Sequence, residues 1–294
     1  MKVAVIGANG QLGNDVVRIF AGQGHEVSAL THADLEITDC ESVSLTLREL
    51  GPAMVINTAA MHHVEKCERE PERALEVNAI GARNLALAAR ELDVPLMHVS
   101  TDYVFGGDKD SPYVELDLPR PLNVYGASKL AGEYLIRLTT EKYFIIRTAG
   151  LCGKHPCRDK GGLNFVDLML KLARERGEVR VVADEVLSPT STLELARQML
   201  VLSESDCYGL YHATAEGACS WYEFAREIFA LSDTRVDLRV ASPNEFPAKV
   251  ARPRYSVLEN HALKLRGLNT FRSWQEGLAE YLGVSQLCEA GQPK

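Results

Sequence analysis

Short apolar runs alternate with longer amphipathic stretches over the first half of the chain. The runs are rich in aliphatic and β-branched residues, and they cover residues 2–7, 26–30, 54–60, 95–101 and 143–151. Between them, apolar positions recur with helical periodicity in residues 11–24, 40–50 and 71–93. This alternation indicates repeated βαβ units, and so it predicts an α/β fold whose doubly wound parallel sheet carries helices on both faces.

The pattern becomes irregular after about residue 150, where loops mix with isolated helical stretches. A chain of 294 residues with 46% hydrophobic composition is long enough for one large domain and a smaller one. We therefore expect a Rossmann-type domain in residues 1–150. Residues 151–294 should form mainly a smaller lobe over the strand ends, with some segments that return to the first domain.

A glycine-rich segment, GANGQLG, follows the first apolar run and opens the first helical stretch. Gly7 permits a tight turn, Gly10 lets the backbone approach a pyrophosphate, and Gly13 lets helix and strand pack closely. Such a turn can be purely structural, but its place in the first βαβ unit favours an NAD(P) site. The expected contacts are Gly7, Asn9, Gly10, Gln11, Leu12 and Gly13.

The residues after the second apolar run normally decide between NAD and NADP. A carboxylate there favours a free ribose hydroxyl, whereas a basic group favours a phosphate. Thr31 and His32 follow Leu30 with neither an acid nor an arginine beside them. The sequence leaves the cofactor open between NADP and NAD, with a slight preference for NADP.

Tyr125 and Lys129 stand four residues apart in the helical segment NVYGASKLAGE. Positions i and i+4 share one face of a helix, so both side chains can reach the same space. A nearby ammonium lowers the pKa of a tyrosine, which makes it a candidate general acid or base. The alternative is a half-buried tyrosine and a solvated lysine, but the pair follows a dinucleotide loop in a βαβ chain, and this context favours catalysis.

The formal net charge of −8 argues against a nucleic-acid groove. No signal-peptide core or membrane-length apolar stretch is present, which predicts a cytoplasmic protein without a membrane partner. The seven cysteines are scattered, as reduced thiols are. Two groups invite a metal interpretation, but neither has a recognisable ligand spacing, and we expect no metal: Cys152, His155 and Cys157, and His62, His63, Glu65 and Cys67.

Several segments in order, STDYVF, PLNVYGASKLAGE, NFV, SPTSTLELA, SWYEFA and RPRYSVLEN, together resemble a known family. The chain is similar to the extended short-chain dehydrogenase/reductases, and within them to the dTDP-4-dehydrorhamnose reductase group. The resemblance implies reduction of the 4-keto group of a nucleotide-linked 6-deoxysugar, most simply dTDP-4-dehydro-L-rhamnose. It makes Thr101 the hydroxyl that binds the substrate carbonyl, Tyr125 the proton donor and Lys129 the residue that holds the nicotinamide ribose.

The resemblance also implies further contacts. On the cofactor these are Glu36, Ile37, Ala59, Ala60, Met61 and Ser100, besides Tyr125 and Lys129. On the sugar nucleotide they are Thr101, Asp102, Tyr103, Asn164, Pro189, Thr190 and Arg252, with Arg252 as a partner for the diphosphate.

Gly106 and Glu36 depart from the residues usual in that group, which weakens the assignment of the sugar. Two alternatives remain, namely a nucleotide-sugar epimerase or dehydratase, and a non-catalytic NADP-binding regulatory subunit. Tyr103 follows Asp102 where dehydratases resemble Thr-Asp-Glu, and so reduction is preferred. Either a monomer or a homodimer is compatible with the sequence.

Overall fold

A parallel sheet of six strands forms the centre of the computed structural model, which describes residues 1–156, 162–242, 245 and 250–284. Its order is β10–β5–β4–β3–β1–β2. The strands are β1 (Lys2–Ile6), β2 (Glu26–Leu30), β3 (Met54–Asn57), β4 (Leu96–Thr101), β5 (Tyr143–Thr148) and β10 (Gly209–His212). The chain passes from β1 to β2 and returns with β3 on the other side of β1, so the winding reverses there. This confirms the predicted doubly wound α/β fold, in which ligands bind beyond the strand ends at the reversal.

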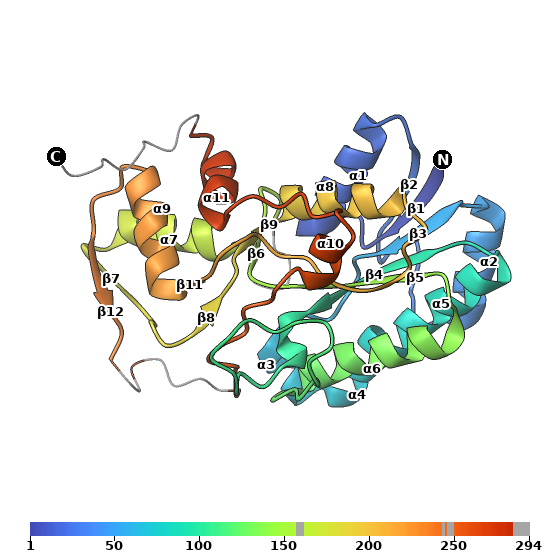
Figure 1. Cartoon of the computed structure of the whole chain (residues 1–294), viewed down its shortest axis with the longest axis horizontal. Coiled ribbons are helices and arrows are strands. Elements are labelled where there is room, and N and C mark those ends of the chain that lie inside the picture. The colour runs from blue at the N-terminus through green and yellow to red at the C-terminus, as the bar shows by residue number, and fades with distance from the viewer. Residues whose placement is uncertain (157–161, 243–244, 246–249, 285–294) are drawn as a thin grey trace.

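Helices cover both faces of this sheet (Figure 1). One face carries α1 (Gln11–Gly22), α8 (Thr192–Ser203) and α10 (His261–Leu265), and the other carries α2 (Cys40–Leu50), α5 (Ala82–Glu91) and α6 (Val124–Thr139). Val3 and Val5 of β1 pack against the first set, whereas Ala4 and Ile6 pack against the second. Side chains of a strand point alternately to its two faces, so a short apolar run is buried on both.

The helical stretch 71–93 is not one regular helix. After α3 (Val64–Arg69), the chain forms α4 (Pro71–Leu75), a π-helical segment η1 (Glu76–Gly81) and then α5. Asn78 lies in the π-helical segment, and its amide bonds the backbone N–H and C=O of Met61, both at 2.9 Å. A π-helical turn inside a helix often marks a functional site, and this one lies beside α6.

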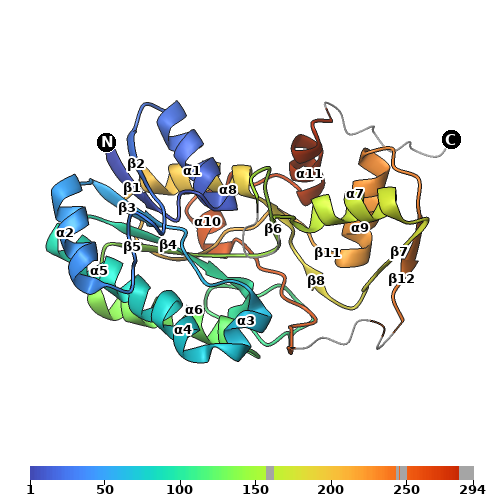
Figure 2. The same cartoon turned by 180° about the vertical axis from the view of Figure 1, so that it is seen from behind.

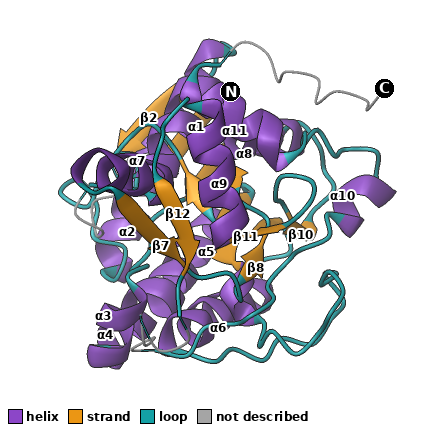
Figure 3. Cartoon of the chain, turned by 90° about the vertical axis from the view of Figure 1, so that its left-hand side faces the viewer, coloured by secondary structure: helices purple, strands orange, loops and turns teal. Residues whose placement is uncertain are grey.

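The C-terminal lobe has a core of its own, rich in aromatic residues. It contains α7 (Phe165–Glu175), α9 (Trp221–Leu231) and α11 (Trp274–Leu282), with β7 (Glu178–Val181) beside β12 (Asp237–Val240) (Figures 2 and 3). Two further pairs link it to neighbouring segments, β8 (Val186–Leu187) with β11 (Cys219–Ser220), and β6 (Leu151–Cys152) with β9 (Thr190–Ser191).

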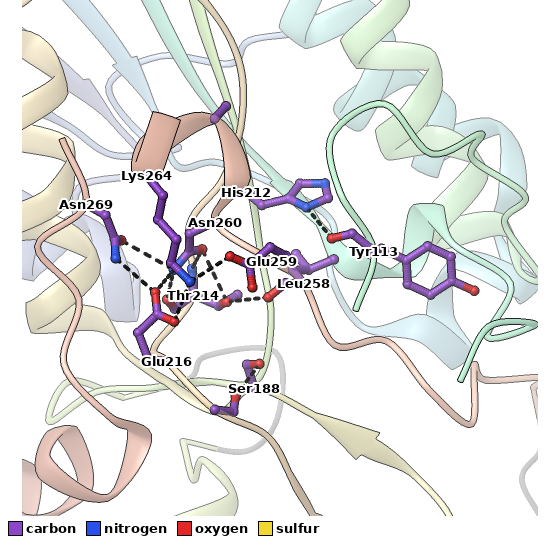
Figure 4. A network of polar contacts seen from close by, with 12 residues as sticks. Tyr113, Ser188, His212, Thr214, Glu216, Leu258, Glu259, Asn260, Lys264 and Asn269 are labelled. Atoms are coloured by element: carbon purple, nitrogen blue, oxygen red, sulfur yellow. Dashed lines mark hydrogen bonds and ion pairs between the residues drawn. The ribbon is translucent and has the colours of Figure 1, made fainter. Parts of the chain in front are cut away.

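A polar network centred on Asn260 fastens the C-terminal segment to the chain beyond β10 (Figure 4). The Asn260 side chain accepts a hydrogen bond from the Thr214 N–H (3.0 Å) and donates to the Thr214 carbonyl (2.7 Å) and to Glu216 (2.9 Å). Lys264 of α10 binds the same Glu216 at 2.8 Å. The chain therefore crosses between the sheet and the lobe several times, and α8, β10 and α10 lie with the sheet.

Candidate active site

The glycine loop joins β1 to α1 as a close backbone turn. Gly7 has a φ of +76°, and a Cβ there would lie 2.7 Å from the Ala59 nitrogen. A Cβ on Gly13 would lie 2.2 Å from the Gly7 carbonyl oxygen. Gly10 is the N-cap of α1, and no side chain caps that helix. The first-turn N–H groups of α1 are therefore free of side-chain caps, as an anion-binding helix terminus requires.

The loop at 59–61 lies against this turn. Asn57, at the end of β3, accepts a hydrogen bond from the Ala59 N–H at 3.0 Å, and Met61 is held by Asn78. The Asn78 amide also donates to the Ser128 hydroxyl of α6 at 2.9 Å. Ala59, Ala60 and Met61 are thus fixed between the glycine loop and α6, beside the point where the sheet reverses.

Four side chains meet where β4 ends and α6 begins, those of Thr101, Asp102, Tyr103 and Tyr125. Thr101 is the last residue of β4, and its hydroxyl donates to Asp102 at 3.0 Å. The Tyr125 phenol lies within the influence of the Thr101 hydroxyl, which acts to lower the Tyr125 pKa against the effect of burial. Tyr103, in the short 3-10 helix η2 (Asp102–Val104), packs edge-on against Tyr125 at 5.9 Å between ring centroids. A hydroxyl pair at the carboxyl end of the sheet can bind and protonate a carbonyl oxygen.

The start of α6 places Tyr125 at this position. Asn123 is the N-cap of α6, where it accepts a hydrogen bond from the Gly126 N–H at 2.8 Å and donates to the Ala251 carbonyl at 3.0 Å. A Cβ on Gly126 would lie 2.1 Å from the Tyr103 carbonyl oxygen, so the absence of a side chain lets the two segments touch. The proline-rich loop before Asn123 cannot continue a helix, and so α6 begins here.

The pKa of Tyr125 is raised, whereas a tyrosine beside an ammonium is expected to have a lowered pKa. Burial raises the pKa of Tyr125 above its usual value, and Lys129 is not among the groups that lower it. Lys129 points instead into the protein, with its Nζ 3.0 Å from Nε2 of the buried His98. Burial also raises the pKa of Asp102 to about 6. Tyr125 is therefore a neutral phenol at physiological pH, which suits a proton donor.

Comparisons with known proteins agree with this geometry. The family model described as the RmlD substrate binding domain matches residues 1–286. The chain belongs to this family. It is 42% identical over 281 residues to the spore coat polysaccharide biosynthesis protein SpsK of Bacillus subtilis, covering 96% of each.

Two solved structures are similar to this chain over nearly its whole length. A dTDP-4-dehydrorhamnose reductase of Clostridium acetobutylicum matches with a TM-score of 0.92 and 41% identity, covering 98% of this chain and 100% of that one. The dTDP-4-dehydrorhamnose reductase of Bacillus anthracis, in complex with NADP, matches with a TM-score of 0.91 and 39% identity, covering 95% and 98%.

Within this RmlD-family chain, some expected cofactor contacts have side chains turned elsewhere. Leu12 and Ile37 are buried in the two cores that flank the sheet. The Ser100 hydroxyl donates to Glu133 at 2.5 Å inside the protein. For these three residues we had expected contact with the cofactor, and only their backbone remains available for it. Alternation along β4 explains Ser100, since it faces away from its neighbour Thr101.

A basic side chain from another part of the chain lies at the loop that follows β2. Arg73 of α4 binds Glu36 at 3.0 Å, and His32 lies 3.5 Å from the same carboxylate. The Glu36 carboxylate also accepts a hydrogen bond from the Thr38 N–H at 3.1 Å. Arg73 is distant in sequence from Leu30, and only the fold brings it to this loop.

Two of the expected substrate contacts in the lobe, Asn164 and Thr190, form hydrogen bonds within the protein, and a third, Pro189, is buried. Asn164 caps α7 through the Asp167 N–H (3.1 Å) and donates to the Gly153 carbonyl (2.9 Å). Thr190 is fully buried and bonds the Ser188 carbonyl and the Ala215 N–H. Pro189, which lies between Ser188 and Thr190 in the sequence, is also buried. Backbone groups take up part of the bonding capacity of Asn164 and Thr190, and their contact with the sugar nucleotide stays a prediction. Asn9 lies on the glycine loop, and Gln11 is the first residue of α1, with its side-chain amide donating to the Leu151 carbonyl at 3.3 Å.

Arg252 crosses from the C-terminal segment to α3. It binds Glu65 at 2.7 Å, and Glu65 lies 3.2 Å from His63, the N-cap of α3. The guanidinium is thus paired with a carboxylate where we had expected a diphosphate.

Cys67 and Cys157 belong one to each of the two groups that invited a metal interpretation in the sequence. Cys67 is buried, with its Sγ directed at the Met61 carbonyl (3.3 Å). Cys157 lies outside the described residues. Among residues that the structure describes, no group of three or more His, Cys, Asp or Glu side chains is placed to hold a metal ion. The same part of the chain contains no helix that is long and apolar enough to span a bilayer.

Proposed function

We propose that this chain reduces the 4-keto group of a nucleotide-linked 6-deoxysugar, dTDP-4-dehydro-L-rhamnose, to give dTDP-L-rhamnose. The observation that carries the proposal is the placement of the Tyr125 phenol, at the start of α6, with the Thr101 hydroxyl at the carboxyl end of β4, where Thr101 acts on the Tyr125 pKa. Membership of the RmlD family supports a nicotinamide-dependent oxidoreductase, and the relatives named dTDP-4-dehydrorhamnose reductase support this substrate.

A bound NADPH or NADH supplies the hydride. Thr101 holds the sugar carbonyl oxygen by a hydrogen bond, and Tyr125 donates its hydroxyl proton to that oxygen while the carbonyl carbon gains the hydride. The ketone becomes a secondary alcohol, with a new C–H bond from the hydride and a new O–H bond from the Tyr125 proton. The Tyr125 phenolate must then regain a proton. Because burial raises the pKa of Tyr125, the hydroxyl holds its proton until the alkoxide develops.

NADP is the cofactor that the loop after β2 supports better. Arg73 supplies a guanidinium beside Glu36, and such a group can bind a ribose phosphate bidentately once it exchanges its carboxylate partner. The NADP complex of the Bacillus anthracis relative supports the same choice. NAD remains the alternative, and Arg73→Gln should reduce affinity for NADPH while leaving that for NADH nearly unchanged.

Arg252 is proposed to bind the sugar-nucleotide diphosphate by exchanging Glu65 for phosphate oxygens. The guanidinium is part-buried, and its buried Nε has no partner among the described residues. A bidentate phosphate would satisfy that donor. Asn164, Pro189 and Thr190 then support the wall of the lobe from within.

The test is the loss of NADPH or NADH absorbance when the purified protein meets dTDP-4-keto-6-deoxyglucose with and without a 3,5-epimerase. Oxidation that requires the epimerase supports the rhamnose reductase. Oxidation without it indicates direct reduction of the keto-glucose, and bound NAD with no net oxidation indicates an epimerase. Absence of turnover with either cofactor would refute the proposal and favour a regulatory subunit. Tyr125→Phe is the matched control for adventitious oxidation.

A further inference from the structure

His98 and Lys129 form a contact that the proposed chemistry does not use. The two side chains are 0% and 1% exposed, and their Nε2 and Nζ atoms are 3.0 Å apart. His98 comes from the middle of β4 and Lys129 from the second turn of α6. Water does not mediate a 3.0 Å contact, so the two nitrogens share a single hydrogen, and the tautomer decides which one carries it.

Asn57 determines the tautomer of His98. The Asn57 Oδ1 atom accepts the hydrogen bond from the Ala59 N–H at 3.0 Å, which fixes the orientation of the amide. Its Nδ2 therefore faces Nδ1 of His98, at 2.9 Å. An amide nitrogen only donates, and so Nδ1 of His98 must be the acceptor and carries no hydrogen.

A neutral His98 then carries its proton on Nε2, which points at Lys129. An ammonium has three donors and no acceptor, so two N–H groups would oppose each other if Lys129 were charged. The contact is a hydrogen bond only when Nζ has a lone pair. We propose that His98 is a positioning residue that holds Lys129 as an unprotonated amine in the cofactor-free protein.

The charges around the pair agree with this assignment. Burial lowers the pKa of Lys129 to about 8, against an opposing effect of Glu133 one turn further along α6. That carboxylate is bound by Arg147 of β5 at 2.6 Å and by Ser100 of β4. The Nε2–H donor, which only the neutral amine accepts, lowers the Lys129 pKa further.

The remaining neighbours supply no charge that would hold an ammonium. On α6, one turn before Lys129, Tyr125 is neutral because burial raises its pKa. Burial, the largest cause, lowers the pKa of His98 well below its ordinary value, so the ring is not a cation. Asp102 at the end of β4 is bound by the Thr101 hydroxyl and is not among the groups that act on the Lys129 pKa.

The consequence for the active site rests on the proposed function. If Lys129 acts as a cation beside the nicotinamide ribose, the protein must take up a proton there when the cofactor binds. The complex then has a higher Lys129 pKa than the free protein. Linkage requires that NADPH affinity falls as pH rises between these two pKa values, and is independent of pH below the lower one.

The first measurement is nitrogen NMR of the cofactor-free protein with labelled histidine and lysine. In the wild type at pH 7, we expect the unprotonated shift on Nδ1 of His98 and the protonated shift on Nε2. Lys129 should titrate below pH 7, so that its amine carries no proton at that pH, against an ordinary value of ~10.4. A proton on Nδ1, a doubly protonated ring, or titration of Lys129 above pH 7 would each overturn the proposal.

The Asn57→Asp variant reverses the relay. One carboxylate oxygen still accepts a hydrogen bond from the Ala59 N–H. The other accepts a hydrogen bond from Nδ1–H of His98, which favours the tautomer with the proton on Nδ1. Nε2 then becomes an acceptor for a charged Lys129. We expect the Lys129 pKa to rise by at least about one unit. The direct effect of the new charge is measured by making the same change in a His98→Phe background, where no tautomer can switch.

A smaller rise in the His98→Phe background supports the relay, and an equal rise in both backgrounds refutes it. Should His98→Phe fail to fold, the wild-type tautomer decides alone. None of these readouts uses a sugar or turnover. A chain with the expected tautomer and no reductase activity would refute the proposed function and leave this inference standing.

Discussion

Buried polar side chains have different partners at the end of β4 and in the C-terminal lobe. The Thr101 hydroxyl bonds the neighbouring Asp102 carboxylate and acts on the pKa of Tyr125, and Ser256 acts on the pKa of Asp102. Thr190 bonds backbone groups, and Asn164 bonds two backbone groups besides the side chains of Gln11 and Tyr281. Side chains that bond each other can exchange a partner for a ligand at little cost, whereas those that satisfy buried backbone groups hold the chain in place. The first group suits catalysis and the second suits architecture.

The largest expected effect tests the first half of this comparison. Tyr125→Phe removes the proton donor and should lower kcat by roughly 10²–10⁴-fold, because the hydroxyl acts only as the alkoxide forms. NADPH affinity should be unchanged within about two-fold. Stopped-flow turnover and fluorescence titration of NADPH measure the two quantities. Substantial turnover by the variant would remove Tyr125 from the proton-donor role.

The glycine loop gives the next effect in size. A Gly13→Ala methyl group would lie 2.2 Å from the Gly7 carbonyl oxygen, so the loop must shift. We expect NADPH affinity to fall by roughly 100-fold, or about 2.7 kcal/mol. The matched control is Gly22→Ala at the other end of α1, where a Cβ meets nothing within 4 Å. Equal affinity in both variants would show that close backbone packing is unimportant for the site.

Asp102 gives a pH-dependent stability effect. Burial raises its folded-state pKa to about 6 from an ordinary value of 3.8, so the folded protein binds more protons between these values. Its ionisation therefore destabilises the fold as pH rises through that window. Asp102→Asn should be more stable than the wild type at pH 7 by on the order of 2–3 kcal/mol, and this difference should vanish by about pH 4. Urea unfolding at several pH values measures it, and a gain that persists at pH 4 would contradict the assignment.

The smallest effect concerns the lobe. Asn164→Ala removes the N-cap of α7 and a buried donor, and should lower the free energy of unfolding by about 1–2 kcal/mol. Asn164→Asp is the matched control, since it retains the cap and removes only the amide donor. Thermal unfolding and the KM for the sugar nucleotide separate the two roles. A raised KM without a loss of stability would restore Asn164 as a substrate contact.

Spacing along the chain predicted the parts of the site that depend on a single turn or a single helix. The glycine loop follows β1 as expected, and the βαβ pattern placed it at the reversal of the sheet. By contrast, the helical period placed Tyr125 and Lys129 on one face without revealing that Lys129 is directed at His98. The expected lowering of the Tyr125 pKa by Lys129 was wrong for this reason.

The sequence by itself determined the elements, their alternation and the family, because these follow from local periodicity, turn residues and motif order. The tertiary structure alone decided which polar groups meet. Arg73 reaches Glu36 across 37 residues, and Arg252 reaches Glu65 across 187 residues. The π-helical turn at Asn78 likewise depends on Met61, in a separate loop. Strand order and helix packing decide which partner each of these groups meets. Burial decides the free energy of their charged forms. Neither can be read from a local pattern in the sequence, because both depend on segments that are far apart along the chain.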